Sequence, residues 1–417
     1  MDAMHHLRDG ELHVEDVPLS AVAERFGTPT YVYSRAILET RFRAFGAAFA
    51  GAARPPLVCY AVKANPNLAI LDLFARLGSG FDIVSGGELA RVIAAGGDPG
   101  RTVFSGVGKS ESEMRMALEA GILCFNIESI PELERLGRVA AACGRVAPVS
   151  IRVNPDVDPR THPYITTGLE ANKFGVSHRD APALYRAAVA LDSVRITGID
   201  CHIGSQITEI GPYTDALARV LAMVDRLQSD GIALEHIDLG GGLGIRYDDE
   251  TPPGIDDYAR ALLSVYGDRP QRLVFEPGRW LVGNAGLLLT RVEYLKPGAS
   301  RNFAIVDAAM NDLMRPSLYE AWHPVQPVHP VEAPAQRYDI VGPVCESGDW
   351  LARDRELAIA SGDLLAIGAA GAYGMSMSSN YNTRPRAAEV MIDGSAMYEV
   401  RARERIADLY AHESRLP

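Results

Sequence analysis

The sequence predicts an α/β protein made of a (β/α)8 barrel of the TIM type and a C-terminal all-β domain of sandwich- or barrel-like form. The first observation is that short apolar runs alternate with amphipathic helical stretches between residues 34 and 280. The second is their rhythm, because roughly eight such units of about 30 residues make a closed barrel. The third is that helical periodicity becomes scarce after residue 280, where strand-like runs alternate with Gly/Pro-rich connections.

The candidate barrel strands are short runs rich in apolar and β-branched residues, each followed by polar or glycine-rich residues. They cover residues 57–62, 80–84, 102–105, 123–127, 149–153, 196–202, 236–239 and 272–275. Helical periodicity falls at 35–50, 85–95, 110–120, 130–143, 181–191, 213–229 and 255–266. An open doubly wound sheet is disfavoured, because its first strand–helix turn would carry a glycine fingerprint that this sequence lacks.

The domain boundaries follow from the same change of pattern. We expect the barrel to occupy residues 34–280, and the β domain to combine residues 1–33 with residues 281–417. The strand-like runs of the second domain are 285–295, 303–306, 338–341 and 364–368. The stretch from Trp322 to Pro334 is rich in proline and histidine, so we expect an exposed loop there.

Composition excludes several classes of protein. The 417 residues carry a formal charge of −12, which argues against nucleic acid or an anionic membrane as the main partner. Apolar runs stay far below the roughly 20 residues that span a bilayer. The first residues, Met1–Glu15, have no apolar signal core, so a cytoplasmic location is expected. The five cysteines form no Cys-x-x-Cys, which predicts reduced thiols and no metal site.

Lys63 directly follows the first predicted barrel strand, 57–62, and this position needs a physical reason because burying an ammonium is costly. One interpretation is a strand-end lysine whose amine reaches water. The other is an amine with a lowered pKa that forms a Schiff base. What the other strands bring to the same end of the barrel decides between the two.

Polar and glycine-rich residues gather where the informative strands end. A barrel places its active site at the carboxyl ends of its strands, so these residues are expected to converge with Lys63. The convergence favours the Schiff-base interpretation. The segments are Ser85–Glu88, Asn154–Pro155, His202–Gln206, Gly240–Gly244 and Glu276–Arg279.

The glycine run Gly240–Gly244 is either a tight strand–helix turn or a bare backbone whose N–H groups bind phosphate. It is not a Gly-x-Gly-x-x-Gly fingerprint, because the last position is Ile245. Barrels bind phosphate in the loops after their seventh and eighth strands. Gly278 and Arg279 therefore extend the same candidate site.

His202 and Glu276 complete the pattern of strand-end residues. His202 is either a satisfied structural histidine or a ring that stacks on a planar cofactor. Glu276 is either an ion-pair partner of Arg279 or a carboxylate that keeps a pyridine nitrogen protonated and so makes the ring a better electron sink. Together with Lys63 and a phosphate-binding loop, these residue types point to pyridoxal 5'-phosphate.

Nine segments spread over nearly the whole chain form a specific set. They are 60–65, 81–88, 172–175, 202–206, 240–244, 276–279, 311–316, 345–349 and 371–374. Together they resemble the fold-type III pyridoxal-phosphate-dependent decarboxylases of the alanine-racemase-like barrel family, and among them the diaminopimelate decarboxylases. A single segment such as Glu-Pro-Gly-Arg would be a weak signal.

The resemblance implies that Lys63 carries pyridoxal 5'-phosphate as a Schiff base, that His202 stacks on the cofactor ring, and that Glu276 faces its nitrogen. Lys63 and His202 are the catalytic residues expected in the barrel, and Asp82 is a further expected cofactor-binding residue. The phosphate region would be held by Ser205, Gly241, Gly242, Gly278, Arg279 and Tyr373.

The resemblance also implies a substrate with two amino-acid ends, meso-2,6-diaminopimelate, decarboxylated to L-lysine and CO2 in the last step of lysine biosynthesis. Cys345 would be the catalytic acid that returns a proton to the substrate, and Glu346 would bind the distal ammonium. Both would come from the partner chain of a homodimer with two shared sites. The substrate's carboxylates would be bound by Arg279, Arg315, Tyr319 and Tyr373.

Other functions stay open at this point. A decarboxylase of ornithine, arginine or carboxynorspermidine has the same fold but does not need an arginine for a distal carboxylate. A racemase would use a catalytic tyrosine, and a non-catalytic cofactor-binding barrel would lack residues 281–417. A free cysteine is commonly a small buried hydrophobe, although the polar residues after Cys345 argue against that here. Ala309 stands where the family usually has glycine, with an expected effect on local packing only.

Overall fold

The computed structural model describes residues 5–157 and 173–417, and the chain forms two compact units. The barrel unit contains the described part of Arg41–Ile245 together with Glu250–Trp280. The β unit contains the residues up to Thr40, the short segment Arg246–Asp249, and Leu281–Pro417.

The barrel unit is a closed ring of parallel strands. Around the ring the order is β9-β11-β12-β13-β5-β6-β7-β8, and β8 pairs with β9 to close it. The predicted (β/α)8 barrel is therefore confirmed. A two-residue strand, β10 (Val176–Ser177), adds to β9 in parallel. The ring strands are β5 (Leu57–Ala61), β6 (Gly80–Ile83), β7 (Thr102–Phe104), β8 (Cys124–Ile127), β9 (Ala147–Asn154), β11 (Val194–Asp200), β12 (His236–Asp238) and β13 (Arg272–Phe275).

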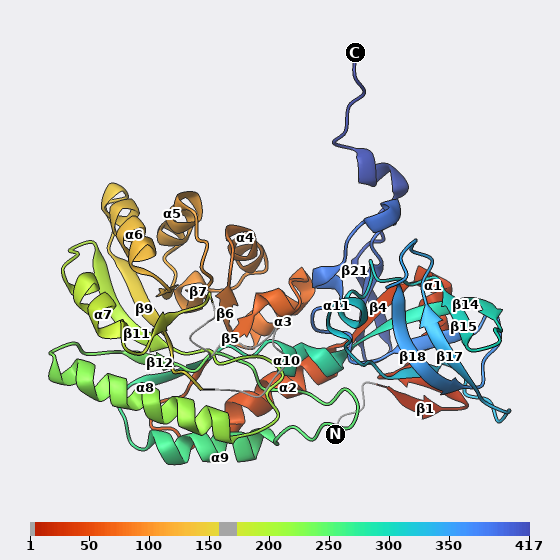
Figure 1. Ribbon diagram of the computed structural model, residues 1–417, viewed down its shortest axis with the longest axis horizontal. Coiled ribbons are helices and arrows are strands. Elements are labelled where there is room, and N and C mark those ends of the chain that lie inside the picture. The colour runs from red at the N-terminus through yellow and green to blue at the C-terminus, as the bar shows by residue number, and fades with distance from the viewer. Residues whose placement is uncertain (1–4, 158–172) are drawn as a thin grey trace. The chain divides into compact units, whose positions relative to one another are not determined.

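Amphipathic helices surround the ring (Figure 1). Serine side chains begin three of them: Ser85, Ser110 and Ser129 each accept a hydrogen bond from the backbone N–H three residues later. The caps Ser85 and Ser129 lie close behind the end of a strand, which keeps those strand-end loops short. The helices are α2 (Arg35–Ala48), α3 (Leu68–Arg76), α4 (Gly86–Ala94), α5 (Glu111–Ala120), α6 (Ile130–Ala142), α7 (Ala181–Val189), α8 (Gly211–Ser229) and α9 (Ile255–Tyr266).

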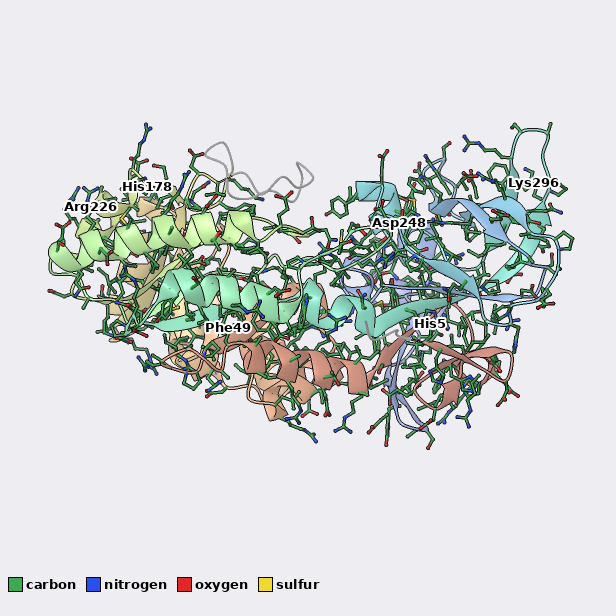
Figure 2. All side chains as sticks on the ribbon, turned by 90° about the horizontal axis from the view of Figure 1, so that it is seen from below. His5, Phe49, His178, Arg226, Asp248 and Lys296 are labelled. Atoms are coloured by element: carbon green, nitrogen blue, oxygen red, sulfur yellow. The ribbon has the colours of Figure 1, made fainter. Side chains whose placement is uncertain are left out.

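Aromatic packing on the outside of β13 sets which of its residues face inward. The Phe49 ring lies 4.4 Å from that of Phe275 and 6.1 Å from that of Tyr258 on α9, between centroids. Figure 2 shows Phe49 among the helices that surround the barrel, whereas Arg226 of α8 is exposed. Because side chains alternate along a strand, Phe275 outside places Val274 and Glu276 inside.

The lower part of the barrel interior is apolar. Leu57, Cys59, Val103, Cys124 and Val274 form one buried cluster there. Burial of apolar surface contributes roughly 25 cal/mol per Å² and holds the ring together. Among the described residues, the buried carboxylates Asp82, Asp238 and Glu276 lie near this cluster, toward the carboxyl ends of their strands.

The β unit is a mixed sheet of the order β18-β17-β15-β14-β4-β20-β21, with β19 paired to β14 and β16 paired to β19. The predicted C-terminal all-β fold is confirmed. A separate three-stranded sheet, β1 (His6–Arg8), β2 (Glu11–Val14) and β3 (Val17–Pro18), precedes α1 (Leu19–Phe26). The large sheet and its helix are β4 (Thr30–Ser34), β14 (Gly286–Lys296), β15 (Asn302–Val306), α11 (Arg315–Tyr319), β16 (Val325–Pro327), β17 (Gln336–Val341), β18 (Trp350–Leu357), β19 (Leu364–Ile367), β20 (Ala388–Asp393) and β21 (Ala396–Arg401).

The prediction of an exposed loop over Trp322–Pro334 is wrong for the first half of this stretch. His323 and Val328 are fully buried, and β16 pairs antiparallel with β19. Proline is tolerated here because β16 lies beyond β19 at the margin of the sheet, where part of the backbone needs no ladder bond. Among the helices that the structure describes, none is long and apolar enough to cross a membrane.

Candidate active site

Lys63 lies at the carboxyl end of β5, in a single 3-10 turn formed by Val62–Ala64. Its Nζ donates to Oδ2 of Asp82 on β6, and the Asp82 side chain is fully buried while 38% of the Lys63 side chain remains exposed. A buried carboxylate thus holds an accessible amine. The sequence predicts Lys63 at a strand end, and the resemblance implies Asp82 as a cofactor-binding residue; the structure brings the two into contact.

Glu88, at the start of α4, is a second carboxylate beside Lys63. Burial raises its pKa to about 6, against the opposing hydrogen bond from the Val84 N–H and the charge of Lys63. The Lys63 amine therefore lies between two carboxyl groups, those of Asp82 and Glu88.

His202 follows β11 and presents a neutral ring. The Gly241 N–H donates to its Nδ1 at 3.1 Å, which leaves the ring proton on Nε2. Burial, followed by the charges of Arg152 and Lys63, holds the His202 pKa well below its usual range. A neutral ring with one anchored nitrogen can stack on a flat partner without adding charge.

The glycine run has a local structural reason in addition to any role in binding. A Cβ on Gly241 would overlap the Glu276 carbonyl oxygen, and a Cβ on Gly242 would overlap that of Gly204. Gly242 also has φ +100°, which disfavours other residues. The loop after β12 can therefore pack directly against the ends of β11 and β13.

Arg279 begins the four-residue helix α10 (Arg279–Val282), directly after the end of β13. Its Nη2 donates to the Ser205 Oγ at 2.9 Å. Gly278 packs closely, since a Cβ there would lie 3.1 Å from the Cβ atoms of Ala61 and Ala64. Ser205, Gly241, Gly242, Gly278 and Arg279 thus come from loops that touch one another.

Glu276 is a buried carboxylate with neutral hydrogen-bond donors. Ser105 Oγ and Asn126 Nδ2 donate to its Oε1 at 3.4 and 3.3 Å. Burial, then the nearby charges of Asp238, Asp82 and Asp200, raises the Glu276 pKa well above its usual range. Among the residues described, no cation forms an ion pair with it.

Asp200 and Asp238 are buried carboxylates that the sequence reasoning missed. One oxygen from each, and one from Glu276, lie within 4.8 Å of one another, so the three could hold a cation. Both aspartates lie at the ends of short apolar strands, and a charge inside such a strand was the available signal.

In the β unit, Arg315 is held by His323, another residue that sequence reasoning missed. Arg315 Nη1 donates to His323 Nε2 at 2.9 Å, and His323 Nδ1 donates to the Gly368 carbonyl at 2.9 Å. The guanidinium lies 4.6 Å from the centre of the Tyr247 ring. His323 was assigned to the expected loop because proline and histidine near it are typical of exposed chain.

Tyr319 and Tyr373 occupy constrained positions in the same unit. Tyr319 closes α11, which Arg315 opens. Tyr373 has φ +58°, an uncommon backbone conformation for a non-glycine residue, and such residues concentrate at functional sites.

The segment that carries Cys345 and Glu346 is fixed by Asp349. The Asp349 carboxylate accepts hydrogen bonds from the Val344 and Met310 N–H groups, both at 2.7 Å. This joins the segment to the residues that precede Arg315. Ala309 fits beside Gly342, where a Cβ would lie 2.6 Å from the Ala309 Cα.

Cys345 is exposed, so its interpretation as a small buried hydrophobe is wrong. The Cys345 N–H donates to Asn382 Oδ1 at 2.9 Å, and the Tyr381 hydroxyl donates to Glu346 Oε1 at 2.5 Å. The backbone of Cys345 is anchored while its thiol is left accessible.

The motif at 172–175 falls partly outside the described residues, which resume at Lys173.

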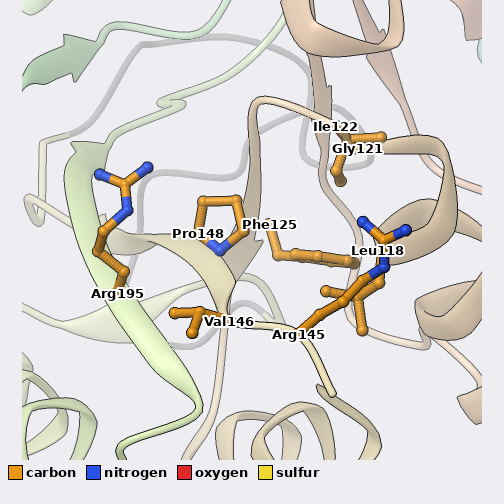
Figure 3. A pocket seen from close by; sticks show the side chains of 8 residues that line it. All are labelled: Leu118, Gly121, Ile122, Phe125, Arg145, Val146, Pro148 and Arg195. Carbon is orange, nitrogen blue, oxygen red and sulfur yellow. The ribbon is translucent and has the colours of Figure 1, made fainter. Parts of the chain in front are cut away.

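A pocket of about 290 Å³ lies elsewhere in the barrel unit (Figure 3). It opens at the amino ends of β8, β9 and β11, opposite to the ends that carry Lys63 and His202. Its lining includes Arg145 and Arg195, with apolar side chains between them. Active sites of barrels lie at the carboxyl ends, so this pocket is not the candidate site.

Residues 35–283 match the family described as "Pyridoxal-dependent decarboxylase, pyridoxal binding domain". A diaminopimelate decarboxylase of Pseudomonas aeruginosa is 62% identical over 98% of both chains. A crystal structure of diaminopimelate decarboxylase from M. jannaschii with L-lysine has a TM-score of 0.95 and 38% identity, over 100% of this chain and 98% of that one. A crystal structure of diaminopimelate decarboxylase from Helicobacter pylori complexed with L-lysine has a TM-score of 0.91 and 40% identity. The match covers 95% of this chain and 99% of that one.

Proposed function

The chain belongs to the pyridoxal-dependent decarboxylases, and among them to the diaminopimelate decarboxylases, and from this we propose how its residues divide the reaction. The reaction is the decarboxylation of meso-2,6-diaminopimelate, which yields L-lysine and CO2 in the last step of lysine biosynthesis. The enzyme depends on pyridoxal 5'-phosphate.

The strand ends of the barrel fit this cofactor. Lys63 offers an accessible amine, and His202 offers a neutral ring. Glu276 is a buried carboxylate without a cationic partner among the described residues, which suits a protonated pyridine nitrogen. Bound pyridoxal phosphate supplies an electron sink for the pair left on the substrate's Cα when CO2 departs.

We assign the cofactor-binding roles within the barrel unit as follows. Lys63 anchors the cofactor and is aimed by Asp82, His202 covers the ring, and Glu276 keeps a proton on its nitrogen. Ser205 and Arg279 are already joined by a hydrogen bond at the loop that would bind the phosphate. The remaining phosphate-binding residues are Gly241, Gly242 and Gly278 of this unit and Tyr373 of the β unit.

The β unit supplies substrate recognition and the proton. Arg315, oriented by His323, binds a substrate carboxylate together with Arg279, Tyr319 and Tyr373. Glu346 binds the distal ammonium. The Cys345 thiol returns a proton to the substrate's Cα after CO2 has left, because it is accessible and its backbone is anchored.

We propose a homodimer in which Cys345 and Glu346 complete the partner's site. Apolar side chains are exposed around this segment: Leu318 is 45% exposed and Tyr381 43%. Ser317, next to Leu318, donates to the Gly348 carbonyl at 2.6 Å, so α11 and the cysteine segment form one surface. Covering such side chains favours association. The free thiols support a cytoplasmic location.

The observation that carries the assignment is the contact of accessible Lys63 with buried Asp82 at the carboxyl end of the barrel. Release of CO2 from meso-diaminopimelate, ornithine, arginine and lysine tests the substrate. We expect turnover of diaminopimelate to exceed that of the others by orders of magnitude. Preference for ornithine or arginine would overturn the assignment, and so would absence of CO2 from diaminopimelate.

A further inference from the structure

The upper level of the barrel interior contains a row of charged side chains in register. Arg152 on β9 pairs with Asp200 on β11, which pairs with Asp238 on β12. Residues paired across parallel strands point to the same face, so the three lie side by side inside the ring. Asp82 and Glu276 complete the level, and all five are buried.

These carboxylates outnumber the cations near them. Asp82 is bonded to Lys63, and Asp200 lies 3.9 Å from Arg152, which also lies 3.6 Å from Glu128. Titratable groups deeper in the interior add no cation: burial lowers the His236 pKa to about 4 and raises the thiol pKa values of Cys59 and Cys124. Since burying unpaired charge is very costly, the cluster must retain protons.

Asp238 is the carboxyl group of this cluster best placed to keep a proton. Its Oδ1 accepts the Gly240 N–H at 2.9 Å, and no cation among the described residues contacts it. If it were ionised, its buried Oδ2 would lack a partner among those residues. One oxygen of Asp238 lies within 4.8 Å of one of Glu276, so a proton on one of the two groups removes their repulsion. Glu276 already accepts from two neutral donors, Ser105 and Asn126, which leaves Asp238 to keep the proton.

We propose that Asp238 is a positioning residue whose protonated carboxyl group donates a hydrogen bond to Glu276. The bond orients Glu276 as a carboxylate toward the cofactor's nitrogen, and the positive charge there compensates its negative charge. The role rests on the proposed cofactor-binding role of Glu276. Burial and the Asp200 charge raise the Asp238 pKa well above its usual range, in agreement with a neutral acid.

Two substitutions distinguish a neutral acid from a charged one. Asp238→Asn keeps an oxygen for the Gly240 N–H and an N–H for Glu276, so it imitates the protonated acid. Asp238→Ala removes both groups. We expect the cofactor dissociation constant of the asparagine variant to stay within about twofold of wild type, and that of the alanine variant to rise about tenfold, as for a lost bond to a charged group.

Infrared difference spectroscopy of the holoenzyme detects directly whether the Asp238 carboxyl group is protonated. Wild type minus Asp238→Asn should show a lost carbonyl stretch of a protonated carboxylic acid. Asp339→Asn, at an aspartate paired with Arg301 at 3.0 Å, is the matched control and should lose no such band.

Three results would overturn the proposal: no lost band in the asparagine variant, cofactor affinity as weak as that of the alanine variant, or affinity dependent on added divalent cation. The last would identify Asp200, Asp238 and Glu276 as metal ligands. The band and the affinity do not depend on which amino acid is decarboxylated, so failure here is separate from failure of the proposed function.

Discussion

The barrel unit and the β unit present their candidate residues in opposite ways. In the barrel, Asp82, Asp238 and Glu276 are buried at neighbouring strand ends, and Asp82 accepts a hydrogen bond from Lys63. In the β unit, Cys345 is exposed and Tyr381 holds Glu346 at the surface. The buried set has its partners within one unit, whereas the exposed set is available to act on the site of a partner chain, as we propose above. We therefore expect variants at the barrel's strand-end residues to change cofactor retention, and variants at Cys345 or His323 to change turnover or substrate binding while the cofactor stays bound.

Lys63→Ala should have the largest effect. Without the amine no covalent anchor remains, so we expect loss of the bound cofactor's visible absorbance and a fall in turnover on the order of 10⁴-fold or more. Absorbance of the dialysed protein near neutral pH checks this. A variant that keeps the band would place the anchor elsewhere.

Cys345→Ala should separate the two units. We expect the absorbance to stay and turnover to fall by about 10²–10⁴-fold, the usual contribution of a positioned acid. Rates from single-turnover measurements with diaminopimelate check this. A near-normal rate would remove the acid role of this thiol.

Mixing Cys345→Ala chains with Lys63→Ala chains tests whether sites are shared between two copies. If they are, mixed dimers contain one intact site and recover part of the activity, while each variant alone stays inactive. Activity that stays at the sum of the two separate variants would argue for self-contained sites.

His323→Ala should have a smaller effect, confined to substrate binding. Arg315 would lose a buried hydrogen bond of about 1.5–3 kcal/mol, so kcat/KM should fall roughly 10–100-fold, mostly through KM, with cofactor affinity unchanged. Steady-state kinetics check this against His329→Ala, a change of an exposed histidine in the same unit. An equal effect of both variants would show that His323 does not orient Arg315.

Glu88→Gln tests the raised pKa of the carboxyl group beside Lys63 through its effect on the free energy of unfolding. The folded-state pKa of about 6 exceeds the ordinary value of 4.5, so the folded protein binds more protons than the unfolded chain between these values. Wild-type stability therefore falls as pH rises from 4.5 to 6. The glutamine variant should be more stable by up to about 2 kcal/mol above pH 6, with no advantage below pH 4.5.

Thermal unfolding between pH 4 and 8 measures this dependence. Glu134→Gln, on the exposed side of α6, is the control for removal of a surface charge. A constant difference between wild type and Glu88→Gln across the range would contradict the raised pKa.

Arg195→Ala should have the smallest effect and brings a third region into the comparison. This arginine lines the pocket at the amino ends of the strands and pairs with Glu235, and the side chains of both are more than half exposed. Exposed pairs contribute about 0–1 kcal/mol, so we expect little change in stability and none in cofactor affinity or turnover. Altered kinetics would show that this end of the barrel communicates with the other.

Several features of the candidate site could be read from the sequence. Strand periodicity locates the ends of the barrel strands, and with them the residues that follow, from Lys63 to Arg279. Asp200 and Asp238 were overlooked, because a short apolar run reads as a strand whatever face its single aspartate takes. His323 was overlooked because composition near it is typical of a loop.

The sequence by itself determined the (β/α)8 barrel and the positions where its chemistry collects, because local periodicity and turn residues act over a few neighbours. Only the tertiary structure decided which carboxyl group lacks a cation, which ring nitrogen of His323 meets Arg315, and that Cys345 is exposed. These depend on strand register and burial, and hence on residues far apart in the chain. Electrostatic energies change steeply with both, which is why the proton on Asp238 can be inferred from the fold but not from the sequence around it.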